Sequence, residues 1–125
     1  MNKKAVILAK GTKYNICCDI DFLTEFMEYL LKDENHGKEI KLIFDQVREG
    51  LKTKKYGDES FGTKAMKPFM NRENDRIICN VTRRKGNKQC IVMSELYLHK
   101  TSQGNNKELT NRYHIVSTYS YDIIE

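Results

Sequence analysis

The apolar residues near the start of the chain are arranged as in β-strands. Residues 4–9 and 13–20 are two runs rich in β-branched and other apolar side chains, and Lys10-Gly11-Thr12 separates them. Two such runs around a short glycine-bearing segment are typical of a hairpin. We therefore expect these residues to form either a short hairpin or a tail that leads into a single strand.

After residue 20 the apolar residues take the spacing of helices. The first set recurs at three and four residues, with Asp19 or Asp21 as the N-cap and Gly37 as the stop, and a second set follows it. The sets are Phe22, Leu23, Phe26, Met27, Leu30 and Leu31, and then Ile40, Ile43, Phe44, Val47 and Leu51. Each set predicts an amphipathic helix that buries one face.

The second half of the chain begins with a loop and continues as a β-hairpin. Residues 53–67 hold turn-forming glycines among several charges and follow neither period, which predicts a long loop. Residues 76–83 and 88–100 are strand-like runs on either side of Arg84-Lys85-Gly86-Asn87, where Gly86 can adopt the positive φ of a tight turn. We expect an antiparallel pair of strands with a basic turn at its tip.

The C-terminal residues predict one more strand. The polar segment 103–106 interrupts the chain, residues 107–112 can form a helical turn, and residues 113–124 are rich in β-branched and aromatic side chains. The order of elements predicts a single α+β domain over residues 1–125. In this domain two N-terminal helices would pack on one face of a twisted antiparallel sheet.

Alternation along the predicted hairpin assigns its side chains to two faces. If the turn closes over Lys85-Gly86, Cys79 lies opposite Val92 and Val81 lies opposite Cys90. The apolar face then carries Ile77, Cys79, Val81, Cys90, Val92, Leu96 and Leu98. The mixed face carries Arg76, Ile78, Asn80, Thr82, Gln89, Ile91, Met93, Glu95, Tyr97 and His99. We expect the helices to cover the apolar face and the mixed face to be a candidate site.

The composition favours a soluble protein with an anionic partner. Lys and Arg outnumber Asp and Glu by 22 to 17, and the net charge of +5 favours nucleic acid, although it also serves solubility. No run approaches the ~20 apolar residues of a membrane span, and the apolar run after Lys4 is too short for a signal peptide. We expect a cytoplasmic protein with no membrane partner.

The sequence carries no metal or nucleotide motif. The cysteines are Cys17, Cys18, Cys79 and Cys90, and the histidines are His36, His99 and His114. The cysteines include no CxxC and the histidines are scattered, so neither set has the spacing of a zinc site. GxGxxG, GxxxxGK[ST] and HExxH are absent as well. We expect reduced, partly buried thiols and no cofactor.

RNA cleavage without a metal is the chemistry that the mixed face fits best. Cleavage needs a group that takes the 2′-hydroxyl proton, a group that protonates the leaving oxygen and a cation that stabilises the phosphorane. His99 and Glu95 are the candidate acid and base, and Arg76 and Lys100 are the candidate cations. A solvated histidine at a strand end is the competing interpretation of His99.

RNA binding has its own candidate residues. Aromatic rings can stack on unpaired bases, and basic side chains at the hairpin tip can contact phosphates. These residues are Tyr97, Tyr119, Tyr121, Arg83, Arg84, Lys85 and Lys88. The competing interpretations are a half-buried pair of tyrosines and a solubilising turn.

Two segments resemble toxins of the RelE/ParE superfamily, especially its RelE and HigB branches. The segments are residues 75–81, opened by Arg76, and residues 91–103, which end in His99-Lys100-Thr101-Ser102-Gln103. In that family an arginine opens one strand and a later strand ends in an apolar-x-x-K-K-T-x-x-Q-like run, which this chain matches with His in place of one Lys. The resemblance covers residues 38–108, but the family's usual proline after the run is missing.

The resemblance implies an mRNA endoribonuclease, ribosome-dependent or free, that a cognate antitoxin holds inactive. In some branches the terminal strand carries catalytic His and Tyr, so Tyr113 and His114, or Tyr119 and Tyr121, would then join the site. Two alternatives remain open, because a fold does not decide a function. One is a non-catalytic module that binds RNA or protein, and the other is a gyrase-directed toxin of the ParE branch.

Overall fold

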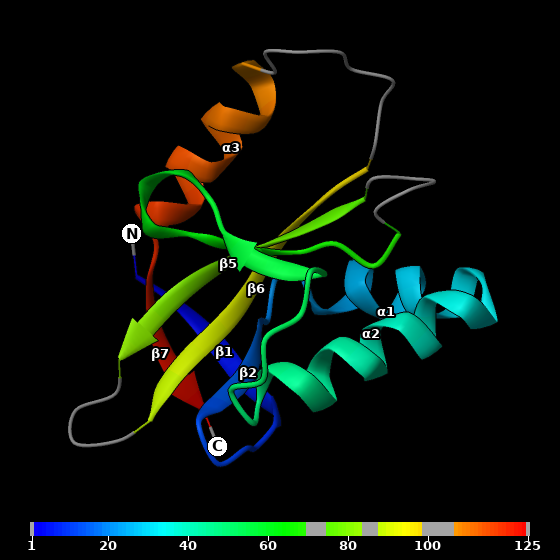
Figure 1. Ribbon diagram of the computed structural model, residues 1–125. Helices are drawn as coiled ribbons and strands as arrows, with labels where there is room; N and C mark the ends of the chain where they lie inside the picture. The colour runs from blue at the N-terminus through cyan, green and yellow to red at the C-terminus, as the bar shows by residue number, and fades with distance from the viewer. Residues whose placement is uncertain (1, 70–74, 84–87, 99–106, 125) are drawn as a thin grey trace.

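A mixed β-sheet is the centre of the structure, a computed structural model that describes residues 2–69, 75–83, 88–98 and 107–124 (Figure 1). The described elements are β1 (Asn2–Ala9), β2 (Tyr14–Asp19), α1 (Leu23–Lys32), α2 (Glu34–Val47), β3 (Tyr56–Asp58), the 3₁₀ helix η1 (Ser60–Gly62), β4 (Lys64–Met66), β5 (Arg76–Arg83), β6 (Gln89–Tyr97), α3 (Lys107–Ser117) and β7 (Ser120–Ile124). The sheet has seven strands in the order β3-β4-β5-β6-β2-β1-β7.

The sheet and its helices correct the predicted architecture. The chain is α+β, but two strands precede the helices and the sheet is mixed, because β2 pairs parallel with β6 and β1 pairs parallel with β7. Figure 1 shows α1 and α2 on one side of the sheet and α3 on the other. The prediction of two N-terminal helices on one face of an antiparallel, RelE-like sheet is therefore wrong.

The predicted last strand is mostly helix. Residues 107–117 form α3, and only Ser120–Ile124 form β7. Tyr113 and Val116 of α3 are buried against Ile78 of β5, and Leu109 packs beside them. This spacing of four and three residues is helical, but the many β-branched and aromatic residues of the segment indicated a strand.

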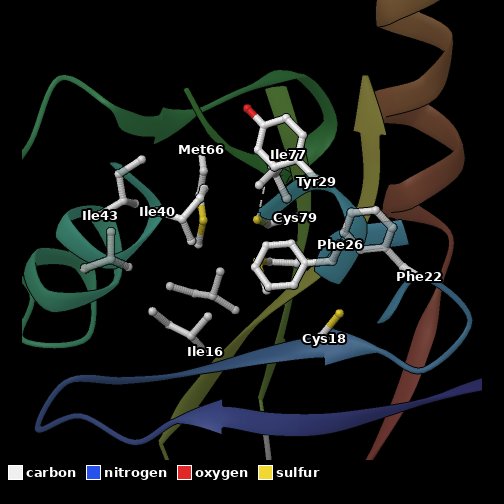
Figure 2. Close-up of a cluster of buried hydrophobic side chains, with 13 residues drawn as sticks. Ile16, Cys18, Phe22, Phe26, Tyr29, Ile40, Ile43, Met66, Ile77 and Cys79 are labelled. Atoms are coloured by element: carbon white, nitrogen blue, oxygen red, sulfur yellow. Dashed lines mark hydrogen bonds between the residues drawn. The ribbon is translucent and has the colours of Figure 1, made fainter. Parts of the chain in front are cut away.

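The face of the sheet under α1 and α2 holds the larger core (Figure 2). Its buried residues are Ile16, Cys18, Phe22, Phe26, Tyr29, Ile40, Ile43, Val47, Met66, Ile77, Cys79, Ile91 and Met93. The predicted apolar faces of both helices supply Phe22, Phe26, Ile40, Ile43 and Val47. Packing of these faces against the strands stabilises the helices more than their intrinsic propensity does.

The boundary between α1 and α2 lies earlier than predicted. Asp33 ends α1 and serves as the N-cap of α2, where its carboxylate accepts a hydrogen bond from the Asn35 backbone N–H at 2.8 Å. An Asp at this position satisfies one of the backbone donors that the first turn of a helix leaves unpaired. Gly37 therefore lies inside α2 and is not a helix stop.

The β5–β6 hairpin has a different register from the predicted one. Cys79 lies opposite Met93 and Val81 lies opposite Ile91, so Ile91 and Met93 face α1 and α2. Cys90 and Val92 belong to the core on the other face, together with Ala5, Cys17 and Tyr121. A shift of one residue moves every side chain of a strand to the opposite face, which is why this part of the face assignment is wrong.

The predicted loop 53–67 contains two short strands. β3 and β4 have three residues each and pair antiparallel, and β4 continues the sheet onto β5. Strands of this length are too short to show an alternating pattern in the sequence.

The four cysteines are buried and free, which agrees with the prediction of reduced thiols. Burial, together with the neighbouring Asp19, raises the pKa of the Cys18 thiol to about 12. No helix in the described part of the chain is long and apolar enough to cross a membrane.

Candidate functional site

A polar pocket of about 470 Å³ is lined by residues from the start of α1, from β1, β2 and β6, and from α3. Three strands and one helix contribute the side chains on which its chemistry depends. They are Lys3 of β1, Asp19 of β2, Ser94 and Glu95 of β6, and Arg112 of α3, with Tyr119 just before β7. We call this site the polar pocket.

A β-bulge directs two consecutive residues of β6 into the polar pocket. Ile78 lies opposite Glu95 and Cys79 lies opposite Met93, so Ser94 is an extra residue without a partner. Ser94 and Glu95 both line the pocket. Regular alternation would turn one of them toward α1 and α2, and re-aiming of side chains is a known role of bulges.

Glu95 is held by a bidentate ion pair. The Arg112 guanidinium donates from Nε at 2.7 Å and from Nη2 at 2.5 Å to the two carboxylate oxygens. The Tyr119 hydroxyl donates to the same carboxylate at 3.3 Å. The Glu95 side chain is only 18% exposed and that of Arg112 is 38% exposed, so solvent screens the pair incompletely. The hydrogen bond to Glu95 raises the pKa of Arg112, which stays charged.

Lys3 supplies the second cation. Its Nζ lies 3.3 Å from a carboxylate oxygen of Asp19 and equally far from one of Asp21, and 4.8 Å from the centre of the Tyr119 ring. Burial by itself would lower the pKa of Lys3, but the hydrogen bonds with Asp21 and Asp19 outweigh burial and raise it. Lys3 therefore remains an ammonium ion beside the Tyr119 ring.

A buried network lies beneath these ion pairs. The Tyr121 hydroxyl donates to Asp19 Oδ2 at 2.7 Å and lies 2.8 Å from Ser94 Oγ. Tyr121 is 7% exposed. Burial has the largest effect on the pKa of its phenol and raises it, and the neighbouring Asp19 carboxylate raises it further. The phenol therefore stays protonated and serves as a hydrogen-bond donor.

The structure brings together part of the predicted site. Glu95 and Tyr97 line the polar pocket, and Tyr119 contacts Glu95. The ring of Tyr121 lies in the core, where it packs with Val92 and Cys17. The predicted residues that the structure does not describe are His99, Lys100, Arg84 and Lys85.

The predicted cation Arg76 on β5 does not line the polar pocket. Arg76 is directed toward Glu59, with Nη1 3.9 Å from the carboxylate, and Lys67 lies 2.9 Å from the same group. Arg83 pairs in the backbone with Gln89, and Lys88, just before β6, is exposed.

The sequence analysis did not predict Lys3, Asp19 and Arg112 as site residues, and it assigned Asp19 only as a candidate N-cap of the first helix. Arg112 follows Glu108 by four residues, a helical spacing that would have placed both on one side of α3. Lys3 and Asp19 carry no such signal, because the pairing of β1 with β2 brings them into the site.

Comparison with family models, with curated proteins and with solved structures finds no match to this chain. Among the described residues no group of three or more His, Cys, Asp or Glu side chains has the arrangement of a metal site. In the polar pocket the Glu95 carboxylate contacts the Arg112 guanidinium and the Tyr119 phenol, and the Lys3 ammonium lies over the Tyr119 ring. These groups can move a proton and stabilise negative charge.

Proposed function

We propose that the chain is an endoribonuclease that cleaves RNA in the polar pocket by general acid and base catalysis without a metal. The observation that carries this proposal is the contact of Glu95 with Arg112 and Tyr119 in an open pocket. A half-buried carboxylate can take a proton, and a guanidinium matches the geometry of a phosphate.

In the proposed reaction Glu95 takes the proton of the 2′-hydroxyl, and the 2′-oxygen attacks the adjacent phosphorus. The bond from phosphorus to the 5′-oxygen breaks, which leaves a 2′,3′-cyclic phosphate and a 5′-hydroxyl. Arg112 and Lys3 stabilise the negative charge of the phosphorane. His99, which follows Glu95 by four residues, stays the predicted acid that protonates the leaving oxygen.

Two ion pairs in the pocket bear on how it would accept an anion. Asp19 is paired with Lys3, and Glu95 is paired with Arg112, so the inner carboxylates are neutralised. A substrate phosphate would compete with Glu95 for the Arg112 guanidinium. When Arg112 turns to the phosphate, an oxygen of Glu95 becomes free to act as the base.

The rim of the polar pocket supports a second candidate function. Asp21, Glu25 and Glu108 add negative charge at the rim, so five carboxylates face two cations. This excess would hold basic groups of a protein partner better than it would hold a polyanion. The second candidate is therefore a non-catalytic module that binds a basic segment of another protein.

The role of a toxin with a cognate antitoxin is a further part of the proposal. It depends on the resemblance of residues 75–81 and 91–103 to RelE and HigB toxins. Expression of the chain should arrest growth, and co-expression of the antitoxin should relieve the arrest. A ParE-like, gyrase-directed toxin would arrest growth without cleavage of RNA.

Cleavage of a purified RNA in the presence of EDTA tests the enzyme proposal. Replacement of Glu95 by Gln keeps the shape of the side chain but removes the base, and we expect the cleavage rate to fall by about a hundredfold or more. The matched control is Asp45→Asn, which breaks the exposed ion pairs of Asp45 with Lys41 and Arg48. Its cleavage rate should equal that of the parent.

Two results would contradict the proposal. A folded Glu95→Gln protein that cleaves RNA at the parental rate would remove Glu95 as the base. A parent that cleaves no RNA, with or without ribosomes, would favour the non-catalytic module.

A further inference from the structure

An exposed phenylalanine is held in an unfavourable backbone conformation on the α3 side of the sheet. Phe61 in η1 has φ 63° and ψ 27°. Among the described residues it is the only one other than glycine that has a positive φ. The left-handed region is unfavourable for a residue with a Cβ, and such residues cluster at functional sites. Phe61 is also 56% exposed as a residue, so burial does not explain this conformation.

The loop around Phe61 is closed by its own hydrogen bonds. The Glu59 backbone N–H donates to the Thr63 carbonyl at 2.9 Å, and the Thr63 hydroxyl donates to the Ser60 carbonyl at 2.8 Å. Thr63 is buried, and Glu59 forms an ion pair with Lys67 at 2.9 Å. These contacts hold both ends of the loop and leave the Phe61 ring at its apex.

A second ring completes a hollow beside Phe61. The ring of His114, on α3, lies 4.8 Å from that of Phe61 at an angle of 47°. Together with Lys107, Thr110 and Asn111 the two rings line a hollow of about 410 Å³. None of the five lining residues is acidic, in contrast to the polar pocket. We call this site the stacking hollow.

We propose that the stacking hollow binds an unpaired base of single-stranded RNA. An exposed aromatic ring stacks on a base without regard to its identity, and an amide can reach the edge of the base. The proposal takes RNA as the partner and so rests on the proposed function. Lys107 would contact the adjacent phosphate, and Asn111 would contact the base.

The position of α3 connects the two sites. Glu108 and Arg112 line the polar pocket, whereas Lys107, Asn111 and His114 line the stacking hollow. A single strand that crosses α3 would therefore place one nucleotide in the stacking hollow while another nucleotide enters the polar pocket. This arrangement would position the scissile phosphate by a contact away from the chemistry.

The absence of tryptophan from the sequence allows a direct test. Phe61→Trp introduces the only indole of the chain at the proposed stacking position, and this indole can be excited at wavelengths where the seven tyrosines do not absorb. We expect a single-stranded 2′-O-methyl oligoribonucleotide, which cannot be cleaved through its 2′-oxygen, to quench this fluorescence. A duplex and an abasic oligonucleotide of equal length should quench it weakly. Equal quenching by the abasic oligonucleotide would show phosphate contact alone and would overturn the proposal.

Two substitutions separate stacking from folding. Phe61→Gly removes the ring and suits the positive φ, so its thermal midpoint should not fall, while its affinity for the oligonucleotide should fall about tenfold or more. Leu31→Ala removes an apolar side chain that is 81% exposed on α1, and its affinity should match that of the parent. Unchanged affinity of Phe61→Gly would assign the exposed ring to another partner, such as a protein, and would overturn the proposal.

Fluorescence quenching at position 61 and RNA cleavage test the stacking hollow and the nuclease separately. Quenching with no cleavage by the parent would leave a stacking site on a protein that is not a nuclease. Cleavage that depends on Glu95, without quenching at position 61, would leave the nuclease and remove the stacking hollow.

Discussion

Tyr121 shows how one hydroxyl connects three strands. Tyr121 is on β7, its hydroxyl donates to Asp19 of β2, and it lies 2.8 Å from Ser94 of β6. Asp19 is 2% exposed, so its carboxylate depends on protein partners in place of water. Loss of one partner of a buried charge leaves a desolvation penalty that no new contact offsets.

We therefore expect Tyr121→Phe to destabilise the fold by about 1–3 kcal/mol. Tyr119→Phe is the matched control, because its hydroxyl makes a longer 3.3 Å bond to Glu95, and Glu95 keeps both bonds from Arg112. The control should cost about 1 kcal/mol or less. Urea unfolding of both variants measures the difference, and equal losses would show that the Tyr121 hydroxyl is not a structural contact of Asp19.

At the scale of elements, the β1–β2 connection is fitted closely to the end of α2. The backbone N–H groups of Lys13 and Tyr14 donate to the Arg48 carbonyl at 3.0 and 3.2 Å. Gly11 lies against the same residue, and a Cβ at Gly11 would stand 2.2 Å from the Arg48 carbonyl oxygen. Only a residue without a side chain permits this approach of strand and helix.

Gly11→Ala should accordingly destabilise the protein by about 1–3 kcal/mol, since the neighbour is backbone and cannot turn away. Gly57→Ala is the control, because no atom lies within 4 Å of a Cβ there. Its stability should stay the same or rise by about 0.4–1 kcal/mol as the unfolded chain loses freedom. Thermal unfolding of the two variants measures these changes in stability. A Gly11→Ala protein as stable as the parent would mean that the turn can shift without loss of stability.

At the scale of the whole molecule, charge is distributed unevenly. The chain carries +5, yet the rim of the polar pocket is acidic and the stacking hollow has no carboxylate. A nucleic acid that binds this molecule would therefore be attracted by basic side chains outside the polar pocket. The β5–β6 connection, with Arg83, Arg84, Lys85 and Lys88, is the predicted source of that attraction.

If this assignment is right, RNA affinity should fall steeply as salt rises, because each neutralised phosphate releases counterions. Lys88→Ala should reduce the slope of log affinity against log salt by about 1. Lys41→Ala is the control, because Lys41 is exposed on α2 and pairs only locally with Asp45. Titrations of an oligonucleotide at several salt concentrations provide the measurement. A slope that Lys88→Ala leaves unchanged would exclude Lys88 from the interface.

What the sequence determined by itself is local. The helical spacing of Phe22 and Phe26, and of Ile40, Ile43 and Val47, predicted most of the faces that α1 and α2 bury. The prediction was wrong for Met27, Leu31 and Leu51, which are exposed. Strands were also predicted at the positions of β5 and β6. These features depend on neighbours within a few residues, and a periodic pattern records them.

What only the tertiary structure decided depends on pairing between distant residues. The β-bulge at Ser94 brings Glu95 back to the predicted face, although the register before it is shifted from the expected one. α3 covers the face of the sheet opposite α1 and α2, because its Tyr113 and Val116 are buried there against Ile78. Asp19 and Tyr121, whose side chains bond across 102 residues, meet because β1 pairs with both β2 and β7. Such long-range pairings leave no period in the sequence, so the polar pocket could not be derived from the sequence alone.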